Sequence, residues 1–93
     1  MTCKGYVSGW EDNKSDPLLK DYIFTSNPKS AVYYESAGDA ATECRFYESV
    51  GISIPSNEGG RHTLRGFKVE ELGPERFVIC CEGPFIPKNL KRD

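Results

Sequence analysis

Four short runs of β-branched and aromatic residues stand out in the hydrophobic pattern, and they fall into two pairs. In the first pair, residues 22–25 and 31–35 flank Asn27-Pro28-Lys29. In the second pair, residues 63–72 and 76–82 flank Gly73-Pro74-Glu75. Proline presets φ, whereas asparagine tolerates tight backbone angles, so each pair predicts a β-hairpin. The alternation slips at Gly66, which predicts a β-bulge at that position.

Between the two hairpins the apolar period changes to three and four residues, which predicts one amphipathic helix. Ser36 is placed to cap the start of this helix, and Asp39 can complement its dipole. Gly51 can adopt the left-handed conformation that ends a helix. The apolar stripe consists of Ala37, Ala40, Ala41, Cys44, Tyr47 and Gly51.

The remaining segments complete the predicted organisation. Residues 5–10 predict a short edge strand, and residues 52–54 an optional strand that Pro55 ends. We expect one domain over residues 1–93, with a loosely ordered N-terminal segment (1–20), a ββαββ core (21–86) and a mobile tail (87–93). Because hairpins precede and follow the helix, the sequence predicts an α+β fold of order β-β-α-β-β(-β). An antiparallel sheet of four to five strands then packs on one amphipathic helix.

Composition narrows the classes of partner. The chain has 93 residues, of which 38% are hydrophobic and 12% aromatic, and this is enough for one core. A net charge of −2 gives no long-range attraction for nucleic acid or for an anionic membrane, so we expect neither as a partner. No apolar run is long enough to span a bilayer, and the N-terminus has no secretory leader pattern. We therefore expect a cytoplasmic protein with reduced thiols.

The four cysteines do not have the spacing of a metal site. There is no C-x-x-C pair, and His62 is the only histidine. Cys80 and Cys81 are adjacent in a predicted strand and should point to opposite faces of the sheet. Cys44 lies on the apolar stripe of the helix, where a free cysteine packs as a small hydrophobe. We expect neither a metal nor another cofactor, and no catalytic residue is assigned.

Apolar side chains occupy both faces of the strands, although one helix covers only one face of a sheet. Along residues 22–24, Tyr22 and Phe24 alternate with Ile23. Three covers for the second face remain open: the N-terminal segment around Trp10 or the stretch 85–86, a second copy in a homodimer, or a partner protein. Base stacking by nucleic acid is the least favoured because the charge is negative.

The leading hypothesis is a non-enzymatic module that binds a partner protein or itself through an exposed aromatic sheet face. Aromatic and arginine side chains most often dominate binding energy. One alternative is a small enzyme or ligand-binding domain that uses Cys81, His62 and the loop at Gly59-Gly60. Another is a phage- or plasmid-type inhibitor of a larger protein. The expected contact residues are Trp10, Tyr33 and Phe85, with Arg61 and Arg65 at the rim.

Overall fold

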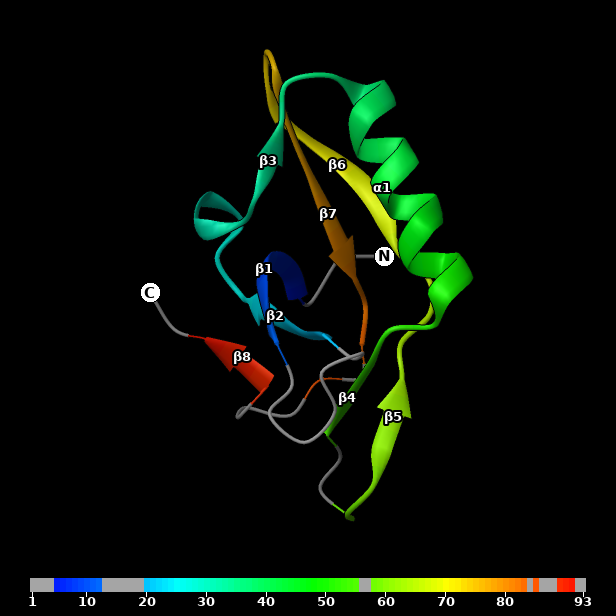
Figure 1. Ribbon diagram of the computed structural model, residues 1–93. Helices are drawn as coiled ribbons and strands as arrows, with labels where there is room; N and C mark the ends of the chain where they lie inside the picture. Colours follow the sequence, from blue (N-terminus) through cyan, green and yellow to red (C-terminus); the bar gives the residue numbers. More distant parts are fainter. Residues whose placement is uncertain (1–4, 13–19, 56–57, 84, 86–88, 92–93) are drawn as a thin grey trace.

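The computed structural model describes residues 5–12, 20–55, 58–83, 85 and 89–91 (Figure 1). In chain order the elements are β1 (Gly5–Asp12), β2 (Lys20–Thr25), the 3-10 helix η1 (Pro28–Ser30), β3 (Tyr33–Tyr34), α1 (Ala37–Val50), β4 (Ser53–Pro55), β5 (Arg61–Thr63), β6 (Lys68–Gly73), β7 (Arg76–Cys81) and β8 (Leu90–Lys91). Over these residues the α+β prediction is confirmed: five antiparallel strands form the main sheet, β8 joins it in parallel, and β4 and β5 form a second small sheet.

β7 organises the main sheet because three strands pair with it. β6 pairs along its whole length. The other side of β7 is shared, since β3 pairs with Phe77 and Val78 while β1 pairs with Cys80 and Cys81. β2 follows β1, and β8 follows β2. The prediction of an edge strand at residues 5–10 is therefore wrong, because β1 lies between β7 and β2.

The first predicted hairpin is also wrong. β2 pairs with β1 from Lys20 to Thr25, whereas Tyr33 and Tyr34 of β3 pair with β7. The Asn27-Pro28-Lys29 segment does turn the chain, but as a 3-10 helix whose start Asn27 caps by accepting a hydrogen bond from the Lys29 amide at 3.0 Å. This turn sends the chain across to another strand and does not return it alongside β2.

The second predicted hairpin is confirmed as β6–β7, with a later start. Gly66 has φ +76°, a left-handed conformation that interrupts the extended run. Residues 61–63 therefore pair with β4 in the small sheet, and β6 begins only at Lys68. The bulge predicted at Gly66 is wrong: the pairing of β6 with β7 is irregular between Glu71 and Gly73.

The helix and both of its ends are confirmed. The Ser36 hydroxyl accepts a hydrogen bond from the Asp39 amide at 3.1 Å, and the Gly51 amide donates to the Tyr47 carbonyl. Gly51 has φ +71° and ψ +71°. The helix buries Ala40, Cys44 and Tyr47. α1 packs along β6 and β7 and against β3 (Figure 1).

The main sheet is buried in part on both faces. The helix-side cluster contains Val7, Phe24, Cys44, Tyr47, Ile52, Ile54, Leu64, Phe67, Ile79 and Cys81. A smaller cluster on the opposite face contains Tyr6, Ala31, Val78 and Cys80, with Leu72 packed against it. Cys80 and Cys81 belong to different clusters, which confirms that they point to opposite faces.

Replacing Gly51 with alanine tests the left-handed end of α1. Because alanine is strained at positive φ, Gly51→Ala should lower the free energy of unfolding by about 1 kcal/mol, measured by urea denaturation. Gly38→Ala is the control, since its φ is not positive and its new Cβ would lie 3.9 Å from the Ser36 hydroxyl oxygen. That variant should leave stability unchanged or raise it by up to about 1 kcal/mol. Equal losses in both variants would contradict the assigned role of Gly51.

Candidate functional site

Aromatic side chains of β1 and β2 extend beyond the part of the sheet that α1 covers. Trp10 and Tyr22 are opposite each other in the β1–β2 ladder, and their ring centroids are 6.4 Å apart. Trp10 is 52% exposed. Tyr22 is half-buried because its ring packs edge-on against Tyr47 of α1, with 5.2 Å between centroids. The sheet therefore carries an exposed tryptophan beside the helix.

The helix contributes its own apolar side chains at this position. Phe46 and Val50 are 50% and 53% exposed, and they lie one turn apart on α1. Glu43, one turn before Phe46, interacts electrostatically with Tyr22 and with Tyr34 of β3. This strip of the helix therefore faces the open part of the sheet. We call the combined set the aromatic surface: Trp10, Tyr22, Tyr34, Phe46 and Val50.

Tyr47 connects the two halves of the aromatic surface from beneath. It is only 2% exposed, and its ring contacts those of Tyr22, Phe46 and Phe67, the last two at 6.2 and 5.7 Å between centroids. Its hydroxyl interacts electrostatically with that of Tyr34. Ring contacts thus run without a break from Trp10 through Tyr22 and Tyr47 to Phe46.

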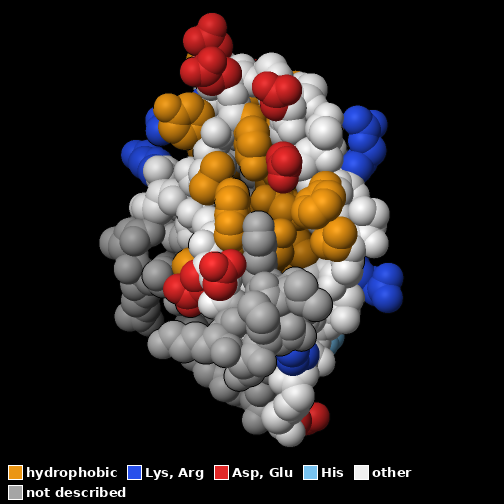
Figure 2. Space-filling view, viewed as in Figure 1, with side chains coloured by type: hydrophobic (Ala, Val, Ile, Leu, Met, Phe, Trp, Pro, Cys, Tyr) orange, Lys and Arg blue, Asp and Glu red, His pale blue; other side chains and the backbone are white. Residues whose placement is uncertain are grey.

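Carboxylates surround these rings. Burial raises the pKa of the tyrosine hydroxyls in and beneath the aromatic surface, and the nearby Glu43 carboxylate raises each of these pKa values further. In Figure 2, hydrophobic side chains gather in the middle of the face beside α1, with Asp and Glu above, among and below them. Most Lys and Arg side chains in this view lie at the outline of the molecule. On this face of the sheet, the tyrosines whose pKa is raised are Tyr22, Tyr34 and Tyr47.

The five residues expected from sequence do not form one surface. Trp10 lies on the helix side, whereas Tyr33 is opposite Val78 of the far cluster and therefore lies on the other face. Tyr33 is 51% exposed, and the guanidinium of Arg76 lies 4.7 Å from the centre of its ring. Tyr33 is thus an exposed aromatic with a separate environment.

Phe85 and Arg61 have structural contacts. The Phe85 ring is 5.0 Å from that of Phe24 and packs on the helix-side core, so neither it nor Trp10 covers the second face. Arg61 forms an ion pair with Asp21 at 3.1 Å. Arg65 is exposed. Residue 86, which belonged to the same expectation as Phe85, lies outside the described residues.

The residues of the aromatic surface that the sequence analysis does not predict are Tyr22, Tyr34, Phe46 and Val50. The predicted apolar stripe of the helix follows the strongest apolar period, which passes through Tyr47. Phe46 lies about 100° from Tyr47 around the helix axis and therefore falls outside that stripe. A second pair of apolar residues at four-residue spacing, Phe46 and Val50, was the available signal. Such a pair on the flank of an amphipathic helix marks apolar surface beyond what the core needs.

Cys81 has the environment of a core residue. It is fully buried, and its thiol donates to the Arg65 carbonyl at 3.1 Å. Burial raises the pKa of the thiol, which is the reverse of what a nucleophile requires. His62 is exposed on β5, and Gly59 and Gly60 have positive φ in the segment between β4 and β5. In the described part of the chain, no three metal-ligating side chains are grouped.

The expectation of four reduced thiols is wrong for Cys80, which is disulfide-bonded. Cys44 and Cys81 are free and buried, and Cys3 lies outside the described residues. The Cys80 sulfur also lies 3.7 Å from a carboxylate oxygen of Glu70, whose other oxygen accepts from the Tyr6 hydroxyl at 3.4 Å. On the face of the sheet opposite α1, Cys80 therefore takes part both in a disulfide and in a polar contact with Glu70.

Comparison with known proteins gives no relative: no protein-family model, no curated protein and no solved structure matches the chain. Among the described residues, no helix has the length and apolar character needed to cross a membrane. The chain is thus defined by its own architecture, a small α+β domain with an aromatic surface beside its helix.

Tyr47→Phe tests the buried hydroxyl in that surface. Loss of the hydroxyl and of its polar interaction with Tyr34 should destabilise the protein by about 0.5–1.5 kcal/mol at neutral pH. The pKa of Tyr47 is raised above its ordinary value of 10.0. Neutral Tyr47 therefore stabilises the fold fully below pH 10, and that contribution is lost as the pH rises further.

The wild-type protein should consequently lose stability faster than Tyr47→Phe above pH 10, so the difference between them should narrow. Urea denaturation at a series of pH values measures this difference. A difference in unfolding free energy between the two proteins that stays constant through alkaline pH would contradict the raised pKa of Tyr47.

Thiol titration tests the cysteine assignment. One disulfide uses two of the four cysteines, so the denatured, unreduced chain should react with Ellman's reagent at two thiols, Cys44 and Cys81. After reduction, four should react. In the native protein the two free thiols should react slowly because both are buried. Four reactive thiols before reduction would show that Cys80 is not in a disulfide.

Proposed function

We propose that this chain is a non-enzymatic protein-interaction module, and that it binds an apolar, positively charged segment of a partner protein on the aromatic surface. One observation carries the proposal. Trp10 and Phe46 stay half exposed at the two ends of a continuous series of ring contacts. Large exposed aromatics that are contiguous and held in place by a core are typical of interfaces.

The exposed halves of these rings offer apolar area for a partner to bury. An aromatic side chain contributes about 150–250 Å² of surface, so the exposed half of Trp10 is about 100 Å². Burying that area is worth about 2.5 kcal/mol. Phe46 offers a similar gain at the other end of the surface. Phe46 packs on Tyr47 directly, and Trp10 packs on it through Tyr22. These contacts reduce the side-chain entropy that is lost on binding.

Charge indicates which partner fits. Glu43 lies among the rings, and Asp12, two residues after Trp10 in β1, is on the same face of the strand. A partner that presents lysine or arginine beside its apolar residues would neutralise these carboxylates and would be steered toward them. A second copy of this chain would bring the same carboxylates face to face, which is unfavourable. A different protein is therefore the preferred partner.

The state of the cysteines bears on the enzyme alternative and on the cellular compartment. The free thiols are buried, so the Cys81 and His62 pair has no activated nucleophile behind it. The disulfide at Cys80 favours an oxidising compartment over the cytoplasm, because cytosolic thiols are kept reduced.

Selection from a random peptide library displayed on phage tests the proposed function. Trp10 is the only tryptophan, so its fluorescence reports directly on binding at the aromatic surface. We expect enriched peptides to combine apolar residues with lysine or arginine, and to change Trp10 emission in a saturable, salt-sensitive manner. Phe46→Ala should weaken binding about 5- to 30-fold, as expected for loss of a major contact.

Tyr33→Ala is the matched control, because Tyr33 is as exposed as Trp10 but lies on the opposite face. It should bind the same peptides with unchanged affinity. Circular dichroism and urea denaturation would establish that both variants are folded. Enrichment of acidic peptides, or equal weakening by Phe46→Ala and Tyr33→Ala, would overturn the proposal.

A further inference from the structure

A groove of about 260 Å³ lies where the main sheet meets the small sheet. β1 and β2 contribute Glu11 and Asp21 to its wall, β4 and β5 contribute Ile54, Pro55 and Arg61, and Asn89 closes it near β8. The volume is below the usual range of about 300–1,000 Å³ for drug-sized ligands. It is suited to a molecule of amino-acid size.

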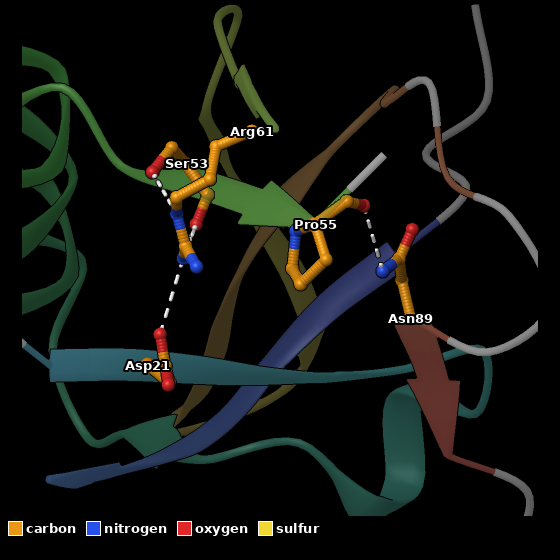
Figure 3. Close-up of polar contacts among 5 residues, drawn as sticks. All are labelled: Asp21, Ser53, Pro55, Arg61 and Asn89. Carbon is orange, nitrogen blue, oxygen red and sulfur yellow. Dashed lines mark hydrogen bonds and ion pairs between the residues drawn. The ribbon is translucent and has the colours of Figure 1, made fainter. Parts of the chain in front are cut away.

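Polar contacts fix the walls of this groove (Figure 3). Arg61 donates from Nε to the Ser53 hydroxyl at 2.8 Å, and from Nη2 to the Ser53 carbonyl at 2.9 Å and to Asp21 at 3.1 Å. It thereby ties the small sheet to β2. On the other side, the Asn89 side-chain amide donates to the Pro55 carbonyl at 3.3 Å. The groove is therefore held open by residues from separate elements.

Two charged groups in the groove keep unused hydrogen-bonding capacity. Within the described residues, the Nη1 group of Arg61 has no hydrogen-bond partner, although a guanidinium carries two donors there. The exposed carboxylate of Glu11 likewise has no hydrogen bond or ion pair in that part of the chain. One groove thus presents a cationic donor and an anionic acceptor, with the apolar side chains Ile54 and Pro55 between the strands.

The geometry points to a binding site for a small zwitterion, an α-amino acid with an aliphatic side chain. Its carboxylate pairs with Arg61 Nη1, and its ammonium group pairs with Glu11. Its side chain lies against Ile54 and Pro55. An acid alone would pair with Arg61 but would also face the Glu11 carboxylate, and an amine alone would leave Arg61 Nη1 unused. This site borders the aromatic surface at Tyr22 and goes beyond the proposed function.

Three matched ligands test the site: L-leucine, its decarboxylated analogue isoamylamine and its deaminated analogue 4-methylpentanoate. Two-dimensional NMR of the 15N-labelled protein follows the Asn89 side-chain amide and the Arg61 Nε–H signal. L-leucine should shift both signals saturably. Each analogue should bind at least about fivefold more weakly, because it lacks one charge-assisted pair.

Single substitutions assign each charge to its residue. Glu11→Gln should weaken L-leucine and isoamylamine about two- to fivefold, the range of one exposed ion pair, and should leave 4-methylpentanoate unchanged. Arg61→Lys retains a cation for Asp21 but removes the free terminal nitrogen. It should weaken L-leucine and 4-methylpentanoate and leave isoamylamine unchanged.

Glu71→Gln is the control, since Glu71 is exposed in β6 near the turn at the opposite end of the molecule from β4 and β5 (Figure 1). It should bind all three ligands as the wild type does. Isoamylamine binding as tightly as L-leucine would replace the zwitterion with a simple cation and overturn the inference. Absence of saturable shifts with L-leucine would overturn it as well. Neither result depends on whether peptides bind the aromatic surface.

Discussion

The packing of Tyr47 is the interaction on which the rest of the structure depends. This residue lies on the buried side of α1, 2% exposed, and its ring meets aromatic rings from β2, from the segment before β6 and from its own helix. Its hydroxyl also interacts electrostatically with that of Tyr34 of β3. One side chain thus fixes the helix relative to both halves of the sheet. The same contacts hold Tyr22 and Phe46 in the positions that make them available at the surface.

The sequence predicts well the elements whose signals are local. α1 begins at a capping serine and ends at a left-handed glycine, and the β6–β7 hairpin turns within a few residues. Pairing between β1 and β7 joins residues more than seventy positions apart, and no nearby residue indicates it. The Asn27-Pro28 turn shows the limit of local signals. It does turn the chain, but turn chemistry does not say which strand the chain then joins.

The candidate site was predictable in part for the same reason. Trp10 was identified from its residue type, and it is exposed. Assigning Tyr33 to the same surface required knowing the register of β3 on β7, which places Tyr33 beside Val78 on the far face. Phe85 has the same residue type as Phe46 but packs on Phe24. Residue type therefore indicates capacity for binding, whereas exposure and face depend on contacts between distant segments.

Geometry explains why an aromatic surface remains open at all. An α-helix is about 10–12 Å wide, and neighbouring strands are about 4.8 Å apart, so one helix covers roughly two to three strands. α1 covers β3, β6 and β7. β4 packs beside β2, and Phe85 packs on Phe24, but Trp10 lies beyond these covers. Ordinary polar residues would have sufficed at such a margin. Instead a tryptophan lies there in contact with Tyr22, and the helix adds Phe46 and Val50 at the same margin. Apolar side chains in these positions lower solubility and give the isolated domain little stability, so their presence supports the proposal that a partner protein buries them.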